Sequence, residues 1–368
     1  MIYLDNAATS MPKPACVHDA VMCALSKMGS LGRSHHKMAD FASETAYDCR
    51  RTAAKMFDAQ EERVAFTFNA THGLNIAIKS LVKRGDKVVV SGFEHNAVLR
   101  PLHAIGAEIK VAGTKLFDQV DTLSAMSNAI DEQTKAVICT HVSNVFGYIL
   151  PIKEISFICK KRNVPFIIDA SQSAGVLPVS MKELGAAYIA MPGHKGLCGP
   201  QGTGLLICGE DPMPVLEGGT GSLSRELSMP DFLPDRLEAG TQNIHGLAGL
   251  LAGMRFILAE DNILSAERAM IRMLTKRLDL DAFMLFHGSE DVQSGVLSFV
   301  PRRESCETFA QRLSEADIAI RSGLQCAPLA HQSAGTLDSG TIRVSVGATT
   351  RVCEIETFLD LMSNMKKS

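Results

Sequence analysis

A chain of 368 residues with a formal net charge of −3 is long enough for two domains and too weakly charged to favour nucleic acid or an anionic membrane as a partner. Hydrophobic residues make up 46% and charged residues 21% of the sequence, which excludes a disordered chain and is typical of a globular enzyme. The ten cysteines include no C-x-x-C pair, so neither a zinc site nor a disulfide framework is predicted.

The N-terminus has no basic and apolar leader, and the longest apolar stretch, residues 247–259, is too short to cross a bilayer. We therefore expect a soluble, cytoplasmic protein that acts on a small molecule and carries no metal. A reducing compartment also agrees with the scattered cysteines.

The first half of the chain alternates short apolar runs with helical patterns. Strands are predicted at residues 64–68, 87–91, 108–112, 135–141 and 164–169, and helices at residues 71–82, 95–105 and 152–161. Because these strands are apolar on both faces, the pattern predicts an α/β fold with a mainly parallel sheet that is covered by helices.

The pattern changes after about residue 210. Residues 217–234 are rich in Gly, Ser and Pro and predict a loop, and residues 245–277 read as helical. The remainder reads as strand, helix, strand, strand and helix, which predicts a smaller α+β domain. We divide the chain into a large domain of residues 16–245 and a small domain of residues 1–15 and 246–368.

Lys195 and Asp169 are the residues most suggestive of chemistry. Lys195 lies in a small-residue turn after an apolar run, and Asp169 ends the predicted strand 164–169. Ligands bind at the carboxyl ends of parallel strands, and a lysine near a carboxylate there is suited to hold an aldehyde cofactor as a Schiff base with a protonated ring nitrogen. Alone, the two would read as a surface lysine and a helix cap. Together they predict a pyridoxal-phosphate enzyme.

Two further segments follow predicted strands of the same sheet. Thr71 opens a helix, where its hydroxyl and the backbone N–H groups are suited to bind a phosphate, although a plain helix cap by Thr71 or Asn69 explains the fragment equally well. His95 fits either a helix cap or an imidazole that stacks on a cofactor ring and moves protons.

Near the C-terminus, Cys326 follows a Ser-Gly turn, with Arg321 and Arg343 available to favour the thiolate. Most cysteines are inert small hydrophobes, but this setting predicts a reactive thiol. Arg343 lies in an otherwise apolar strand. It is either an inward charge that binds a carboxylate in a bidentate manner or a strand-edge arginine that faces water.

Taken together, these motifs resemble the class V, fold-type I pyridoxal-phosphate enzymes, and within them the cysteine desulfurase and selenocysteine lyase group. The resemblance spans nearly the whole chain and rests on eight segments, which are residues 3–10, 66–71, 94–95, 140–147, 169–172, 193–195, 238–243 and 321–326. It implies a seven-stranded, mainly parallel sheet with helices on both faces and a smaller α+β C-terminal domain.

The resemblance also implies how the cofactor is held. Lys195 would carry pyridoxal phosphate, Asp169 would pair with the pyridine nitrogen, Gln172 would contact the ring hydroxyl, and His95 would stack on the ring. The residues implied for the phosphate are Thr71, His72, His194 and, from a second subunit, Thr241. The active form would therefore be a homodimer.

For the substrate, the resemblance implies that Asn144, Arg321 and Arg343 bind an amino acid, with Arg343 on its carboxylate. Cys326 would accept sulfur from L-cysteine or selenocysteine as a persulfide, release alanine and pass the sulfur to an acceptor protein. Two alternatives are a class V aminotransferase or lyase that acts on another small amino acid, and a cofactor-binding scaffold without chemistry.

Two positions depart from the family pattern. Pro192 stands where relatives usually place Ser or Thr beside the phosphate, which removes a hydroxyl and a backbone N–H. Leu324 and Gln325 precede Cys326 where relatives often carry His or Ala, so we expect an atypical polarity around the thiol.

Overall fold

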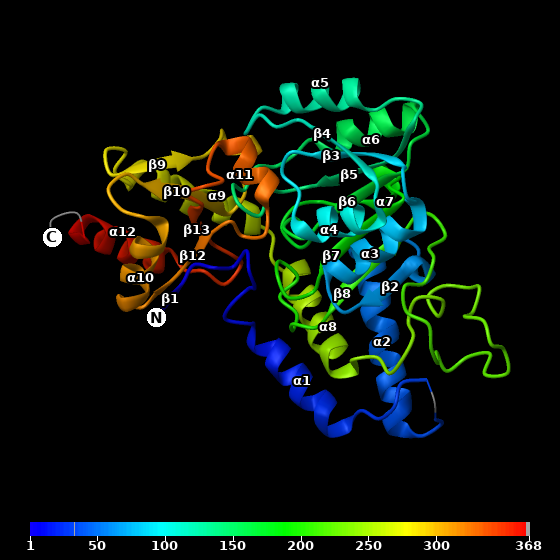
Figure 1. Ribbon diagram of the computed structural model, residues 1–368. Coiled ribbons are helices and arrows are strands. Elements are labelled where there is room, and N and C mark those ends of the chain that lie inside the picture. The colour runs from blue at the N-terminus through cyan, green and yellow to red at the C-terminus, as the bar shows by residue number, and fades with distance from the viewer. Residues whose placement is uncertain (33, 366–368) are drawn as a thin grey trace.

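The computed structural model describes residues 1–32 and 34–365, and Figure 1 shows a large and a small part, each built on its own sheet. The large sheet has the order β2-β8-β7-β6-β5-β3-β4. Its strands are β2 (Val64–Thr67), β3 (Lys87–Ser91), β4 (Glu108–Ala112), β5 (Thr134–Thr140), β6 (Phe166–Asp169), β7 (Tyr188–Pro192) and β8 (Gly204–Cys208). The strands from β7 to β4 are parallel, whereas β8 runs antiparallel to both of its neighbours. The mainly parallel, seven-stranded sheet is confirmed.

Helices cover both faces of this sheet because successive strand residues point to opposite sides. In β3, Val88 and Val90 belong to one apolar cluster and Val89 to the other. The cluster that contains Val88 and Val90 is covered by α3 (Ala70–Leu81) and α4 (Asn96–Ile105). The cluster that contains Val89 is covered by α2 (Lys37–Met56), α6 (Ile152–Lys161) and α8 (Ile244–Leu258). The remaining helices of the large part are α1 (Ala15–Lys27), α5 (Gln119–Ala129), α7 (Met181–Leu184) and the 3-10 turn η1 (Glu61–Arg63).

Between β8 and α8 the chain forms a long loop, as predicted, which Figure 1 shows projecting from the large part. The region 245–277 is helical, as predicted, but the helix is interrupted once. It forms α8 and α9 (Ile263–Arg277), which are separated by a break at residues 259–262. The break contains Asp261 and Asn262, whose short polar side chains favour caps and turns over helix interiors.

The small sheet is antiparallel with the order β12-β13-β10-β9. Its strands are β9 (Phe283–Phe286), β10 (Val296–Pro301), β12 (Arg321–Gly323) and β13 (Thr341–Ser345), and its helices are α10 (Cys306–Glu315), α11 (Pro328–Ala334) and α12 (Val352–Met365), with the 3-10 turn η2 (Glu290–Val292). This arrangement confirms the smaller α+β unit.

The N-terminal segment joins the small part and then crosses to the large one. Strand β1 (Ile2–Tyr3) pairs in parallel with β11 (Ile318–Ala319), and Leu4 lies in the apolar cluster of the small sheet. Further along, the N–H of Ser10 donates to the carbonyl of His194 at 3.0 Å. Residues 5–9 are thereby held between the two parts.

The division into domains stays a prediction. Helix α8 bears on it, because its buried side chains Leu247, Leu250 and Met254 belong to the same apolar cluster as β5 and β6. This favours a boundary after α8 rather than at residue 245.

Among the residues described, none of the helices combines the length and the apolar character needed to span a bilayer. Nor do the His, Cys, Asp and Glu side chains of the described part form a group of three placed to bind a metal ion.

The carboxyl group of Glu267, on α9, is buried against the start of β10 and is only 4% exposed. Burial raises its pKa to about 8, although a hydrogen bond from the backbone of Gly295 opposes the shift. An acid whose pKa is raised by folding stabilises the fold below its unfolded pKa, and this contribution is lost as the pH rises through about 8.

We therefore expect Glu267→Gln to raise the melting temperature relative to the parent protein more at pH 9 than at pH 6. The two increases should differ by about 2 °C or more. The exposed neighbour Glu260→Gln is the matched control and should show no such pH dependence. Scanning calorimetry at the two pH values measures the difference. An equal effect of Glu267→Gln at both would contradict the assignment.

Candidate active site

A cavity of about 230 Å³ lies at the carboxyl ends of the parallel strands, where the small part and the N-terminal segment approach the large sheet. The predicted site residues that line it are Thr71, His95, Asn144, Asp169, Gln172, His194, Lys195, Arg321, Cys326 and Arg343. His72 and Thr241 do not line it. The cavity therefore gathers side chains from segments that are far apart in the sequence.

Asp169 ends β6 and is 2% exposed. One of its carboxylate oxygens accepts a hydrogen bond from the N–H of Ser171 at 2.9 Å. A buried carboxylate is costly unless it meets a cation, so its place on the cavity wall is suited to a positively charged ring nitrogen.

Lys195 follows β7 in a turn that brings backbone segments unusually close together. A Cβ at Gly193 would lie 2.1 Å from the Thr203 hydroxyl, and one at Gly196 would lie 2.3 Å from the Ala174 carbonyl oxygen, so both positions require glycine. Burial lowers the pKa of Lys195 to about 8, with Asp169 opposing the shift and Arg343 and Arg321 adding to it. The amine is therefore partly neutral near neutral pH, which makes it a usable nucleophile and base.

His95 takes the helix-cap role that its sequence left open, while its stacking and proton-transfer roles stay predictions. It is the N-cap of α4, where its Nδ1 accepts from the N–H of Ala97 at 3.0 Å, and it also lines the cavity. Burial lowers its pKa to about 4, with Asp169 opposing and Lys195 adding to the shift. Because Nδ1 is an acceptor, the neutral ring carries its proton on Nε2.

The start of α3 forms one end of the cavity. The helix is capped by Asn69, whose side chain accepts from the N–H of His72 at 2.9 Å, so Thr71 is not the cap and lines the cavity instead. His72 stacks on Phe68 with the ring centroids 4.7 Å apart, outside the cavity lining. The positive end of the helix dipole thus faces the cavity.

His194 lines the same cavity as this helix end. Its Nδ1 is buried and has no hydrogen-bond partner among the described residues. Burial lowers the pKa of His194 to about 4, so the ring is neutral near neutral pH. A buried ring nitrogen without a protein partner is expected where a phosphate binds, because the phosphate oxygens can accept a hydrogen bond from it. Pro192 lines the cavity as well.

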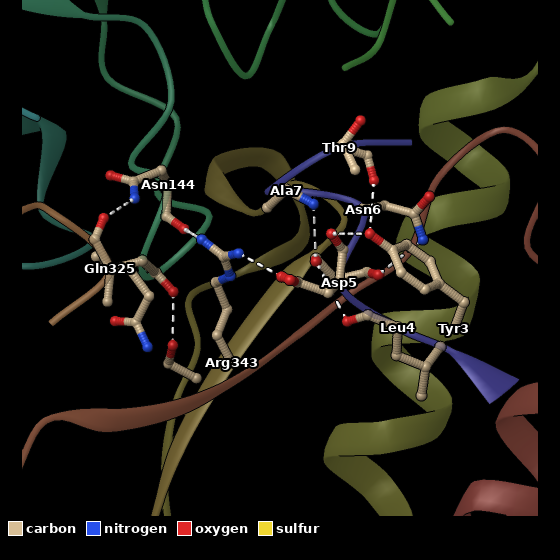
Figure 2. A network of polar contacts seen from close by, with 12 residues as sticks. Tyr3, Leu4, Asp5, Asn6, Ala7, Thr9, Asn144, Gln325 and Arg343 are labelled. Atoms are coloured by element: carbon tan, nitrogen blue, oxygen red, sulfur yellow. Dashed lines mark hydrogen bonds and ion pairs between the residues drawn. The ribbon is translucent and has the colours of Figure 1, made fainter. Parts of the chain in front are cut away.

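Arg343, on β13, is buried and points inward, which excludes a strand-edge arginine in water. Figure 2 shows its guanidinium between two segments: Nη1 donates to the carbonyl of Asn144 at 2.9 Å, and Nη2 meets the Asp5 carboxylate at 2.5 Å. Its Nε has no partner among the described residues. An arginine so placed can offer its remaining N–H groups to a carboxylate.

Asp5 is a residue that residue-by-residue analysis missed. It lies in the segment 3–10 that carries part of the family resemblance, and this was the available signal. Ala7, in the same segment, also helps to position a site residue, because its carbonyl accepts a hydrogen bond from the Gln172 amide at 2.9 Å.

Cys326 lies on the loop between β12 and α11 and is exposed. It lines the same cavity as Lys195 and Arg321. Thr241 is also exposed, on the long loop before α8. Its predicted contact belongs to a second subunit and stays a prediction.

Residues 2–358 match the family described as Aminotransferase class-V, so the chain belongs to this family. It is 32% identical to a probable cysteine desulfurase of Pyrococcus abyssi over the whole chain and 95% of that protein, and 30% identical to one of Xylella fastidiosa over the whole chain and 91% of that protein. The apo structure of a cysteine desulfurase from Thermococcus onnurineus superimposes with a TM-score of 0.91 at 31% identity, covering all of this chain and 94% of that one.

Pyridoxal phosphate is the cofactor that this family implies, and the cavity fits it. The Lys195 amine and the Asp169 carboxylate share the cavity, and the start of α3 forms one end of it. The unpartnered Nδ1 of His194 is available to a phosphate. These groups match, in kind, the aldehyde, the ring nitrogen and the phosphate of the cofactor.

Proposed function

We propose that the protein is a pyridoxal-phosphate-dependent cysteine desulfurase, which converts L-cysteine or selenocysteine to L-alanine and receives the sulfur or selenium on Cys326. The observation that carries the proposal is the shared cavity of Lys195, Asp169 and Cys326, which come from three separate segments. The similarity to proteins named cysteine desulfurase supports it.

When bound, pyridoxal phosphate supplies an aldehyde for the amino group of the substrate and an electron sink for the bond broken at Cα. Lys195 holds the cofactor and, once freed, removes the Cα proton, a role that its lowered pKa of about 8 favours. Asp169 keeps the ring nitrogen protonated. His95, which carries its proton on Nε2, assists proton transfer.

The two ends of the cavity would bind the two anionic ends of the complex. Thr71, His194 and the start of α3 bind the cofactor phosphate, with Thr241 reaching across from a second subunit. His72, whose ring lies outside the cavity lining, stays a predicted further contact. Gln172 contacts the ring hydroxyl. Arg343 binds the substrate carboxylate, and Asn144 and Arg321 hold the rest of the amino acid.

The Cys326 thiolate attacks the substrate sulfur, so that a sulfur–sulfur bond forms while the Cβ–sulfur bond breaks and its electron pair goes to Cβ. Protonation of that carbon gives alanine, and Cys326 is left as a persulfide. A thiol of an acceptor protein, or a small thiol, then takes the outer sulfur and restores Cys326. The homodimer, the cytoplasmic location and the acceptor protein are parts of this proposal.

The proposal is tested by incubating the pyridoxal-phosphate-loaded protein with L-cysteine and measuring alanine and protein persulfide. We expect Cys326→Ala to lose alanine formation from cysteine by at least about a hundredfold, because the nucleophile is gone. Cys16→Ser, at another exposed cysteine, is the matched control and should retain the parent rate.

A protein that forms no alanine, or a Cys326→Ala variant that matches the parent, would remove the desulfurase assignment. Transamination of pyruvate that persists in Cys326→Ala would select an aminotransferase instead.

A further inference from the structure

The loop that carries Cys326 is held in an uncommon backbone conformation. Gln325 and Cys326 both have positive φ, at 42° and 59°, which costs a residue with a side chain about 1–2 kcal/mol. The side chains alternate in exposure, since Leu324 and Cys326 are exposed whereas Gln325 is only 4% exposed. Something must therefore offset the strain, and the buried side chain is the candidate.

The Gln325 amide is part of a chain of hydrogen bonds in which each residue donates to the next. Its Nε2 donates to the carbonyl of Thr341 at 3.0 Å, so its oxygen is the atom that meets Nε2 of His331 at 2.9 Å. His331 must then carry its proton on Nε2, and the Thr336 hydroxyl donates to Nδ1 at 2.8 Å. All four residues are buried, so each broken link would leave an unsatisfied polar group.

Two backbone contacts fix the same loop against the large part. The carbonyl of Gln325 accepts from the Asn144 side chain at 2.8 Å, a contact that Figure 2 shows beside Arg343, and the carbonyl of Cys326 accepts from the N–H of Asn96 at 2.8 Å. Asn96 is the first residue of α4, directly after His95. The thiol is thus tied, through its own backbone, to residues that neighbour the reacting groups.

We infer that Gln325 is a positioning residue that holds the Cys326 thiol in the cavity. The expected change in kcat rests on the proposed function, whereas the anchoring of the loop by Gln325 does not. Glutamine suits the position because it presents an acceptor to His331 and a donor to Thr341 at the same depth. A methionine has similar length but can make neither bond, so Gln325→Met removes the anchor with little change in volume.

The experiment compares Gln325→Met, Thr336→Val and the exposed neighbour Leu324→Ala with the parent, all loaded with pyridoxal phosphate. For Gln325→Met we expect kcat for alanine formation to fall about tenfold or more while KM for cysteine stays within about twofold, because the nucleophile rather than substrate binding is displaced. Thr336→Val removes the outermost link and should show a smaller fall, and Leu324→Ala none.

Hydrogen exchange of the peptide that spans residues 324–331 is the second measurement. This segment contains the N–H of Ala327, which donates to the carbonyl of Leu324 at 2.9 Å. We expect faster exchange in this peptide of Gln325→Met and unchanged exchange elsewhere.

A Gln325→Met variant with the parent kcat and the parent exchange would overturn the inference. So would loss of protection throughout the protein, because the role would then be structural. If the parent protein makes no alanine, the proposed function fails, yet the exchange comparison still decides whether Gln325 anchors the loop.

Discussion

Lys195→Ala is expected to lower kcat for alanine formation from cysteine by at least about 10⁴-fold, because in the proposed mechanism one side chain both holds the cofactor and removes the Cα proton. Burial lowers its pKa to about 8, which makes the amine competent for both tasks. Single-turnover assays with saturating pyridoxal phosphate and cysteine measure the loss. A small primary amine added to the variant should restore part of the rate.

Lys115→Ala is the matched control for this prediction. Lys115 is a surface lysine that pairs with Asp118, and neither residue lines the cavity. We expect this variant to keep the parent rate, since exposed ion pairs contribute little. A Lys195→Ala variant as active as Lys115→Ala would refute the assignment of the reactive lysine.

Asp169→Asn is expected to lower kcat by about 10²–10⁴-fold, which corresponds to the roughly 3–5 kcal/mol lost when one partner of a buried charge pair is removed. The asparagine retains an oxygen that can accept from the N–H of Ser171, so the local backbone should keep its conformation. What is lost is the negative charge that, in the proposed mechanism, keeps the cofactor ring protonated and makes it an electron sink.

The same variant has a second signature. The Asp169 carboxylate raises the pKa values of both His95 and Lys195, so its removal should lower both and shift the acidic limb of the pH–rate profile to lower pH. Asp131→Asn, at an exposed carboxylate paired with Lys87, is the control and should leave the profile unchanged. An Asp169→Asn profile with the parent limb and the parent kcat would contradict the assigned role.

The sheet could be predicted because it depends on local patterns. Runs such as residues 87–91 are apolar on both faces, and a parallel strand that is covered on both sides requires this. The placement of Asp169 and Lys195 in one cavity also followed from strand ends alone, since parallel strands end at the same edge of the sheet.

Contacts between distant segments could not be read from such patterns. Asp5 and Arg343 are 338 positions apart, and Asn144 and Gln325 are 181 apart, so no local rule predicts either pair. For the same reason the sequence left open whether Arg343 faces water or the interior. By residue type Thr71 and Asn69 were both reasonable helix caps, and only the structure shows that Asn69 takes that role.

In the proposed mechanism the Lys195 amine reacts with the aldehyde of pyridoxal phosphate. The most direct test is to load the protein with the cofactor, reduce it with borohydride, digest it and locate the pyridoxyl group by mass spectrometry. We predict one pyridoxyl group per chain, on the peptide that contains Lys195. A pyridoxyl group on another lysine, or none at all, would contradict the account.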